Sequence, residues 1–154
     1  MTPEYKKTIL DILTTALKGN KDAVSYCMNL YEVAHVWDDL IDKDKEITDA
    51  AIHTAFIRCL VDIPYNSFYR QNIDYLLPLQ HNSVLQWIDA NKMEKMDLQS
   101  KYKAYMLKAS FLQIVNCCAA LIGGHEWAME IGADLRNALY AETLEEFLNE
   151  VQYA

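Results

Sequence analysis

Glycine and proline, which most often interrupt helices and form tight turns, are scarce in this chain. Four Gly and three Pro occur among its 154 residues. A sheet protein of this size needs many turns, and those turns draw on these two residues. The long stretches between them are rich in Leu, Ala, Lys, Glu and Met, which favour helices. We therefore predict an all-α fold, a single-domain bundle of about seven helices over residues 1–154.

The composition limits the kinds of partner that we expect. Apolar residues make up 52% of the chain, which is enough for a substantial core. The net charge of -8 disfavours nonspecific binding to nucleic acid, because that binding needs a surplus of Lys and Arg. The apolar run of residues 114–124 is interrupted by Asn116 and is shorter than the roughly 20 residues that span a bilayer. We expect no membrane span.

The N-terminal segment, residues 1–19, has the pattern of an amphipathic helix and lacks the apolar core and cleavage site of a secretion signal. We therefore expect a cytoplasmic protein. Its cysteines show neither CxxC spacing nor the Cys and His spacing of zinc sites. In a reducing compartment we expect them to be buried thiols that pack as small apolar groups. They are Cys27, Cys59, Cys117 and Cys118.

Capping residues and helix breakers predict where the helices begin and end. Thr2 with Pro3 forms an N-cap and first-turn pair, and Thr48 and Asp97 are N-cap residues. Thr143 with Glu146 matches a capping box, which predicts a separate last helix. The predicted bounds are Thr2 to Gly19, Lys21 to Asp42, Thr48 to Pro64, Ser67 to Pro78, Asn82 or Ser83 to Lys92, Asp97 to the Gly123–Gly124 pair, and His125 onward.

The sequence EVAHVWDDLID, residues 32–42, ends the second predicted helix with acidic side chains. At about 100° per residue, its groups that can bind metal share an arc of about 120° on one helix face. Such oxygen-rich ligation suits Mg²⁺, which keeps several waters and is completed by substrate phosphates. We therefore predict a metal site at this helix end. Its candidate residues are Glu32, His35, Asp38, Asp39 and Asp42.

The position of these carboxylates works against helix stability. In the last turn of a helix they meet the negative end of its dipole, at a cost of about 0.3–1 kcal/mol each. Upstream on the same side lie Val24, Met28 and Tyr31, which are apolar, whereas a solvated stripe stays polar along its length. We expect a central helix whose carboxylates stand at the mouth of a cavity floored by these three residues. The alternative is an exposed helix end that leads into the charged turn of residues 43–46.

The pair Glu32 and His35 also has the ExxH spacing by which helices supply carboxylate-bridged di-iron centres. Such a centre needs a second ExxH, which the sequence lacks. A lone histidine at this position more often forms a hydrogen bond in the core or orients a neighbouring carboxylate such as Asp39. The di-iron interpretation is therefore the weaker one.

Residues 38–42 read Asp-Asp-Leu-Ile-Asp, a complete DDxxD, and the longer stretch AHVWDDLIDKD resembles the first aspartate-rich motif of the class I isoprenoid synthases. The resemblance covers residues 24–44. It implies an all-α fold in which the motif ends a core helix, binds two or three Mg²⁺ ions and holds the diphosphate of an allylic substrate. By resemblance Asp38, Asp39 and Asp42 are the Mg²⁺ ligands, and Met28 and Tyr31 line the pocket for the apolar chain.

The family's second metal-binding motif has no clean counterpart here, and the chain is shorter than the family's catalytic domains. Asn137, Ala141 and Glu145 have the i, i+4, i+8 spacing, but Ala141 replaces the expected hydroxyl. Another set of acidic residues shares one face of the helix that begins near His125, and its alternative interpretation is a solvated surface. This set of second-cluster candidates is Glu126, Glu130, Asp134 and Asn137.

The resemblance implies a Mg²⁺-dependent transferase or lyase that promotes loss of pyrophosphate from an allylic or similarly activated diphosphate ester. The flank HVWDDLIDKD is also similar to small helical proteins of large tailed bacteriophages, which suggests pyrophosphate displacement during base hypermodification. Two alternatives stay open: a noncatalytic helical interaction protein and an all-α nucleotide pyrophosphohydrolase. Ten Tyr and three Trp suit a pocket or a homodimer interface equally well. Candidate cations for the diphosphate are Arg58, Arg70, Lys101, Lys108 and Arg136.

Overall fold

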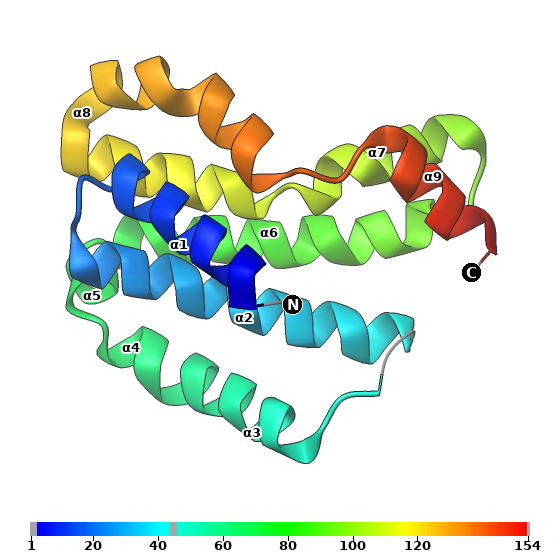
Figure 1. The fold of residues 1–154 in the computed structure, drawn as a ribbon, viewed down its shortest axis with the longest axis horizontal. Helices are drawn as coiled ribbons and strands as arrows, with labels where there is room; N and C mark the ends of the chain where they lie inside the picture. The colour runs from blue at the N-terminus through cyan, green and yellow to red at the C-terminus, as the bar shows by residue number, and fades with distance from the viewer. Residues whose placement is uncertain (1–2, 44–45, 154) are drawn as a thin grey trace. The chain divides into compact units, whose positions relative to one another are not determined.

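The computed structural model of the chain describes residues 3–43 and 46–153, and every regular element in those ranges is helical (Figure 1). The prediction of an all-α fold is confirmed. The chain divides into two compact units, Met1–Ile73 and Asp74–Ala154. Whether they form a single domain stays a prediction. The proposed N-cap Thr2 lies outside the described residues.

The first unit is built around α2, the predicted central helix. It contacts every other helix of that unit, and its residues Tyr26 and Cys27 are fully buried. The ring of Tyr26 stacks on Tyr69, with 5.3 Å between the ring centroids. The elements of this unit are α1 (Pro3–Ala16), α2 (Lys21–Asp42), α3 (Asp49–Ile57), the π-helical η1 (Arg58–Asp62), α4 (Ile63–Tyr65) and α5 (Ser67–Gln71).

Local hydrogen bonds fix both ends of α2. Asn20 is its N-cap and accepts a 3.1 Å bond from the Ala23 N–H. At the other end Lys43 adopts the left-handed conformation, with φ 57°, and its N–H donates to the Asp39 carbonyl at 3.1 Å. The bounds predicted for this helix are therefore confirmed.

Two predicted helix bounds in the proline-containing segments are wrong. The third helix was expected to end before Pro64, but helical backbone continues from α3 through η1 into α4. Pro78 was expected to end a helix, but it lies inside α6 (Ile73–Met93). Because Pro78 stands in the second turn, it removes only the bond that its N–H would make to the Asp74 carbonyl. Ser67 was expected to cap the next helix, but Asn66 caps α5, with its Oδ1 accepting from the Tyr69 N–H at 2.9 Å.

The second unit contains α6, α7 (Leu98–Lys108), α8 (Phe111–Leu139) and α9 (Leu144–Tyr153). The single helix expected from Asp97 to the glycine pair is interrupted at Ala109 and Ser110, between α7 and α8. Asp97 caps α7 as predicted, with Oδ1 accepting from the Ser100 N–H at 2.8 Å. The capping box is confirmed too, because the Thr143 N–H donates to Glu146 at 2.8 Å.

Helix α8 is two helical segments joined at a glycine. Gly124 has φ 81° and ψ 175°, a backbone conformation that only glycine adopts readily. The prediction that the helix ends at the Gly123–Gly124 pair is therefore correct. Residues 125–139 turn back along residues 111–123, as the yellow and orange parts of α8 show in Figure 1.

The cysteine prediction is right for Cys27 and Cys118, which are buried, and wrong for Cys59, which is exposed. Cys59 lies in η1, a segment without a buried residue among those described. None of the four cysteines, all of which lie within the described residues, forms a disulfide, and Cys117 is half-buried.

One helical stretch, Leu98–Leu139, is long and apolar enough to cross a membrane by length and composition alone, with a mean hydropathy of 1.5 and 33% burial in the qualifying window. One such stretch is weak evidence, because the core helix of a soluble protein passes the same test. The glycine turn at Gly124 also interrupts its helical backbone. The absence of a membrane span stays a prediction.

Candidate metal centre

The aspartates of the DDxxD motif occupy the last turns of α2. Asp38 and Asp39 are half-buried and Asp42 is exposed. The last turn of α2 contains no basic residue. Three carboxylates therefore stand at the negative end of the helix dipole, an arrangement that a bound cation would stabilise.

Glu32, one turn and a half upstream, is the most buried acidic residue of the candidate set. Its two carboxylate oxygens form separate ion pairs, one with Lys6 of α1 and one with Arg58 of η1. A buried carboxylate needs such partners, because an uncompensated charge in the interior is costly. The structure thus gives Glu32 two cations in place of a metal, and its role as a metal ligand stays a prediction.

His35 lies beside Tyr31 on the same helix, with ring centroids 4.4 Å apart and the rings tilted by 59°. Tyr31, Met28 and Val24 are buried. The burial of these three side chains agrees with an apolar interior beside the part of α2 that precedes the carboxylates. Their role as the floor of a substrate pocket stays a prediction.

Within residues 3–43 and 46–153, no three His, Cys, Asp or Glu side chains lie close enough together to hold a metal ion. Mg²⁺ does not require an all-protein cage, since it is often held by one or two carboxylates together with waters and substrate phosphates. The donor chemistry of Asp38, Asp39 and Asp42 therefore fits a Mg²⁺ ion that is completed by a diphosphate.

The second-cluster candidates lie in the other unit, on residues 125–139 of α8. All four are exposed, and the opposite face carries Leu135 and Leu139, which are buried. This is the pattern of an amphipathic helix with a solvated polar face. Their role in metal binding stays a prediction. These residues are Glu126, Glu130, Asp134 and Asn137.

Three of the five candidate cations have partners within their own unit. Arg58 pairs with Glu32, and the Lys108 ammonium lies 3.0 Å from Glu94. The Lys101 ammonium donates to the Val151 carbonyl at 3.2 Å. Arg70 and Arg136 are exposed.

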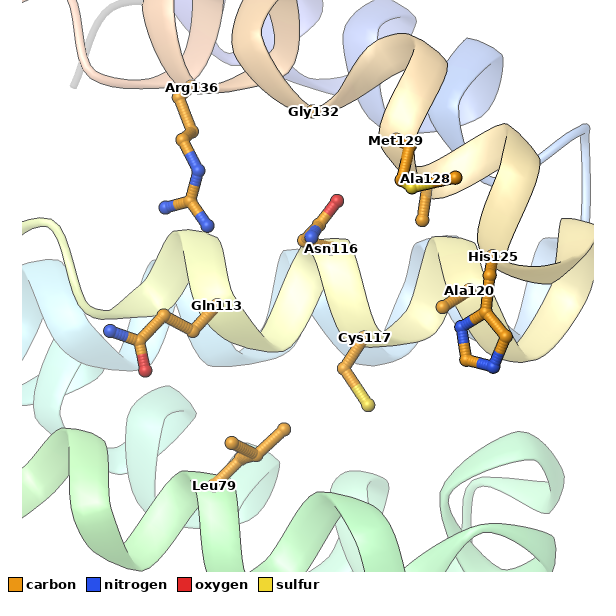
Figure 2. Close-up of a pocket in the computed structure, with 10 residues that line it drawn as sticks. All are labelled: Leu79, Gln113, Asn116, Cys117, Ala120, His125, Ala128, Met129, Gly132 and Arg136. Atoms are coloured by element: carbon orange, nitrogen blue, oxygen red, sulfur yellow. The ribbon is translucent and has the colours of Figure 1, made fainter.

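A cavity that the sequence did not predict lies in the second unit (Figure 2). It has a volume of about 600 Å³, is open to solvent on one side, and is lined by the two segments of α8 and by Leu79 of α6. Two signals in the sequence could have indicated it: Asn116 interrupts an apolar run, and Gly132 leaves a gap in the facing helix. The lining residues are Leu79, Gln113, Asn116, Cys117, Ala120, His125, Ala128, Met129, Gly132 and Arg136.

No protein-family model, curated protein or solved structure matches this chain.

Proposed function

We propose that the chain is a Mg²⁺-dependent protein of the isoprenoid-synthase type, which binds a diphosphate ester and promotes loss of pyrophosphate. The observation that carries this proposal is the position of Asp38, Asp39 and Asp42 in the last turns of α2, without a basic residue in the final turn. The similarity of residues 34–44, which contain these three aspartates, to the first aspartate-rich motif of that family also supports it.

The roles of the protein groups follow from their places on α2. Asp38 and Asp39 are half-buried, so they would hold the metal on the inner side of the helix end, with Asp42 at its exposed edge. The bound Mg²⁺ would supply Lewis acidity that neutralises the charge on the departing pyrophosphate. The ion pairs of Glu32 with Lys6 and Arg58 brace α2 against α1 and η1, and so position the carboxylates.

Calorimetric titration of the full chain with pyrophosphate tests this proposal. We expect pyrophosphate to bind with Mg²⁺ present and not with a chelator present. Asp38→Ala and Asp39→Ala should abolish this coupled binding, whereas Asp11→Ala, an exposed aspartate on α1, should leave it unchanged. Binding that is the same in Asp38→Ala and Asp39→Ala as in the native chain would refute the proposal.

A substrate panel then distinguishes the reactions. Release of pyrophosphate from an allylic diphosphate supports the synthase type, and release from a pyrimidine that carries a 5-hydroxymethyl diphosphate supports base hypermodification. Release from nucleoside triphosphates instead would assign a pyrophosphohydrolase.

A noncatalytic interaction protein is the second candidate function. It is favoured by a row of exposed apolar side chains along α3, η1 and α4, where Phe56 is 61%, Leu60 is 70% and Tyr65 is 79% exposed. Apolar groups this exposed often mark surfaces that bind another protein. This candidate predicts no coupled binding of Mg²⁺ and pyrophosphate in the same titration.

A further inference from the structure

The cavity in the second unit is formed by the backbone of α8. Gly124 turns residues 125–139 back over residues 111–123, and the space between the two segments remains open. A Cβ atom at Gly132 would lie 3.6 Å from Oδ1 of Asn116, so any larger side chain there would enter this space. The cavity therefore depends on two glycines, one at the turn and one in its wall.

The polar groups of the cavity face one another across it. The Arg136 guanidinium extends from one α8 segment toward Gln113 and Asn116 on the other (Figure 2). Within the described residues, the Arg136 side chain has neither an ion pair nor a hydrogen bond. Oδ1 of Asn116 is shielded from solvent and has no hydrogen-bond partner there. A buried polar atom without a partner is unfavourable, and a ligand group in the cavity would let the amide turn and pair.

Apart from His125, the rest of the wall carries no ionised side chain. Leu79, Ala120, Ala128 and Met129 supply carbon and sulfur surface. Burial, together with the neighbouring Cys118, raises the pKa of the Cys117 thiol, so it stays protonated at neutral pH. The wall thus adds no competing anion to the site.

The charge of the lining selects one ligand chemistry. Arg136 is the one permanently charged side chain among the lining residues. A guanidinium matches a carboxylate in charge and in two-point geometry. A phosphate group carries close to two charges and would remain partly uncompensated, beside the exposed acids Glu130 and Asp134 of the same segment.

We propose that this cavity binds a small monocarboxylate with an apolar body. The carboxylate pairs with Arg136, and the body packs against Leu79, Ala128 and Met129. A volume of about 600 Å³ is that of an ordinary small-molecule site. The proposal concerns the second unit alone and does not rest on the metal site at the end of α2.

Titration of the full chain with octanoate, octanol and inorganic phosphate tests this proposal. We expect octanoate to bind, octanol and phosphate to bind at least tenfold more weakly, and Arg136→Met to weaken octanoate binding by about tenfold or more. Arg70→Met, which removes an exposed arginine of the first unit, and Asp38→Ala should leave octanoate binding unchanged. Equal binding of octanol, stronger binding of phosphate, or an unaffected Arg136→Met chain would overturn the proposal.

Thiol labelling locates the ligand in the unaltered chain. Octanoate should slow the reaction of Cys117 with N-ethylmaleimide, because Cys117 lines the cavity. Exposed Cys59, in the other unit, should react at the same rate with and without octanoate. Unslowed labelling of Cys117, or equal slowing of both thiols, would contradict binding in this cavity.

Discussion

The guanidinium of Arg58 forms an ion pair with the carboxylate of Glu32, and this pair joins η1 to α2. Lys6 of α1 pairs with the other oxygen of the same carboxylate. Three helical segments thus meet at one acidic side chain. The side chain of Glu32 is 11% exposed, that of Arg58 is 23% and that of Lys6 is 51%. The two cations therefore differ in how much solvent screens them.

This difference predicts unequal effects of removing the two cations. Arg58→Met should destabilise the fold by about 1–3 kcal/mol, because the buried carboxylate of Glu32 then keeps only Lys6, which solvent screens. Lys6→Met should cost less than about 1 kcal/mol, as for exposed ion pairs. Urea unfolding at neutral pH measures both. A larger effect of Lys6→Met than of Arg58→Met would contradict this assignment.

The helix dipole gives a prediction for the last turn of α2. Without divalent metal, Asp42→Asn should stabilise the chain by about 0.3–1 kcal/mol, because it removes a negative charge from the negative end of the helix. Asp49→Asn is the matched control and should destabilise the chain. Asp49 lies in the first turn of α3, where a negative charge meets the positive end of the helix dipole. Unfolding in a chelator gives both values. Destabilisation by Asp42→Asn would contradict a dominant effect of the helix dipole on this carboxylate.

The turn within α8 should tolerate no side chain. Gly124→Ala should destabilise the chain by about 1–3 kcal/mol, because φ 81° with ψ 175° is accessible essentially to glycine alone. Gly132→Ala should be neutral or stabilise by up to about 1 kcal/mol, since Gly132 is helical and its added Cβ meets Asn116 at an ordinary contact distance. Thermal unfolding of the two variants compares them, and the reverse order of stability would refute the glycine turn.

The capping box of α9 makes stability depend on pH. The Thr143 N–H bond lowers the pKa of Glu146 below the ordinary value of 4.5. A lowered pKa in the folded state means that the ionised carboxylate stabilises the fold above the ordinary value. That contribution is lost as pH falls through the lowered pKa. Glu146→Gln should therefore be less stable than the native chain at neutral pH, and the difference should disappear in acid.

The control for this measurement is Glu150→Gln, which changes an exposed glutamate of the same helix outside the capping box. At neutral pH, Glu150→Gln should reduce the free energy of unfolding less than Glu146→Gln does, because it removes no capping hydrogen bond. If the stability difference between the native and Glu146→Gln chains persisted unchanged in acid, the capping box would be excluded as its source.

Local chemistry explains which parts of the fold were predictable. The caps at Thr48 and Asp97 and the Thr143–Glu146 box were predicted because each is a hydrogen bond between residues three apart. Pro78 misled the prediction because its effect depends on where the helix began, and α6 begins too close to it to be broken.

The site was less predictable, because its partners come from distant segments. No sequence pattern places Lys6 and Arg58 on the same carboxylate, since that contact depends on how α1 and η1 pack on α2. The cavity beside Asn116 likewise exists only after α8 turns back at Gly124. The aspartates themselves were found because they are adjacent in the chain.

The most direct test of the metal site is the NMR spectrum of the amide groups titrated with Mn²⁺, a paramagnetic ion that replaces Mg²⁺ at oxygen-rich sites. We predict that the first signals to broaden belong to residues 38–43, and that Asp38→Ala together with Asp39→Ala abolishes this selectivity. Broadening that begins instead at the exposed acids Glu126, Glu130 and Asp134, or that spreads evenly over the acidic surface, would contradict a metal site at the end of α2.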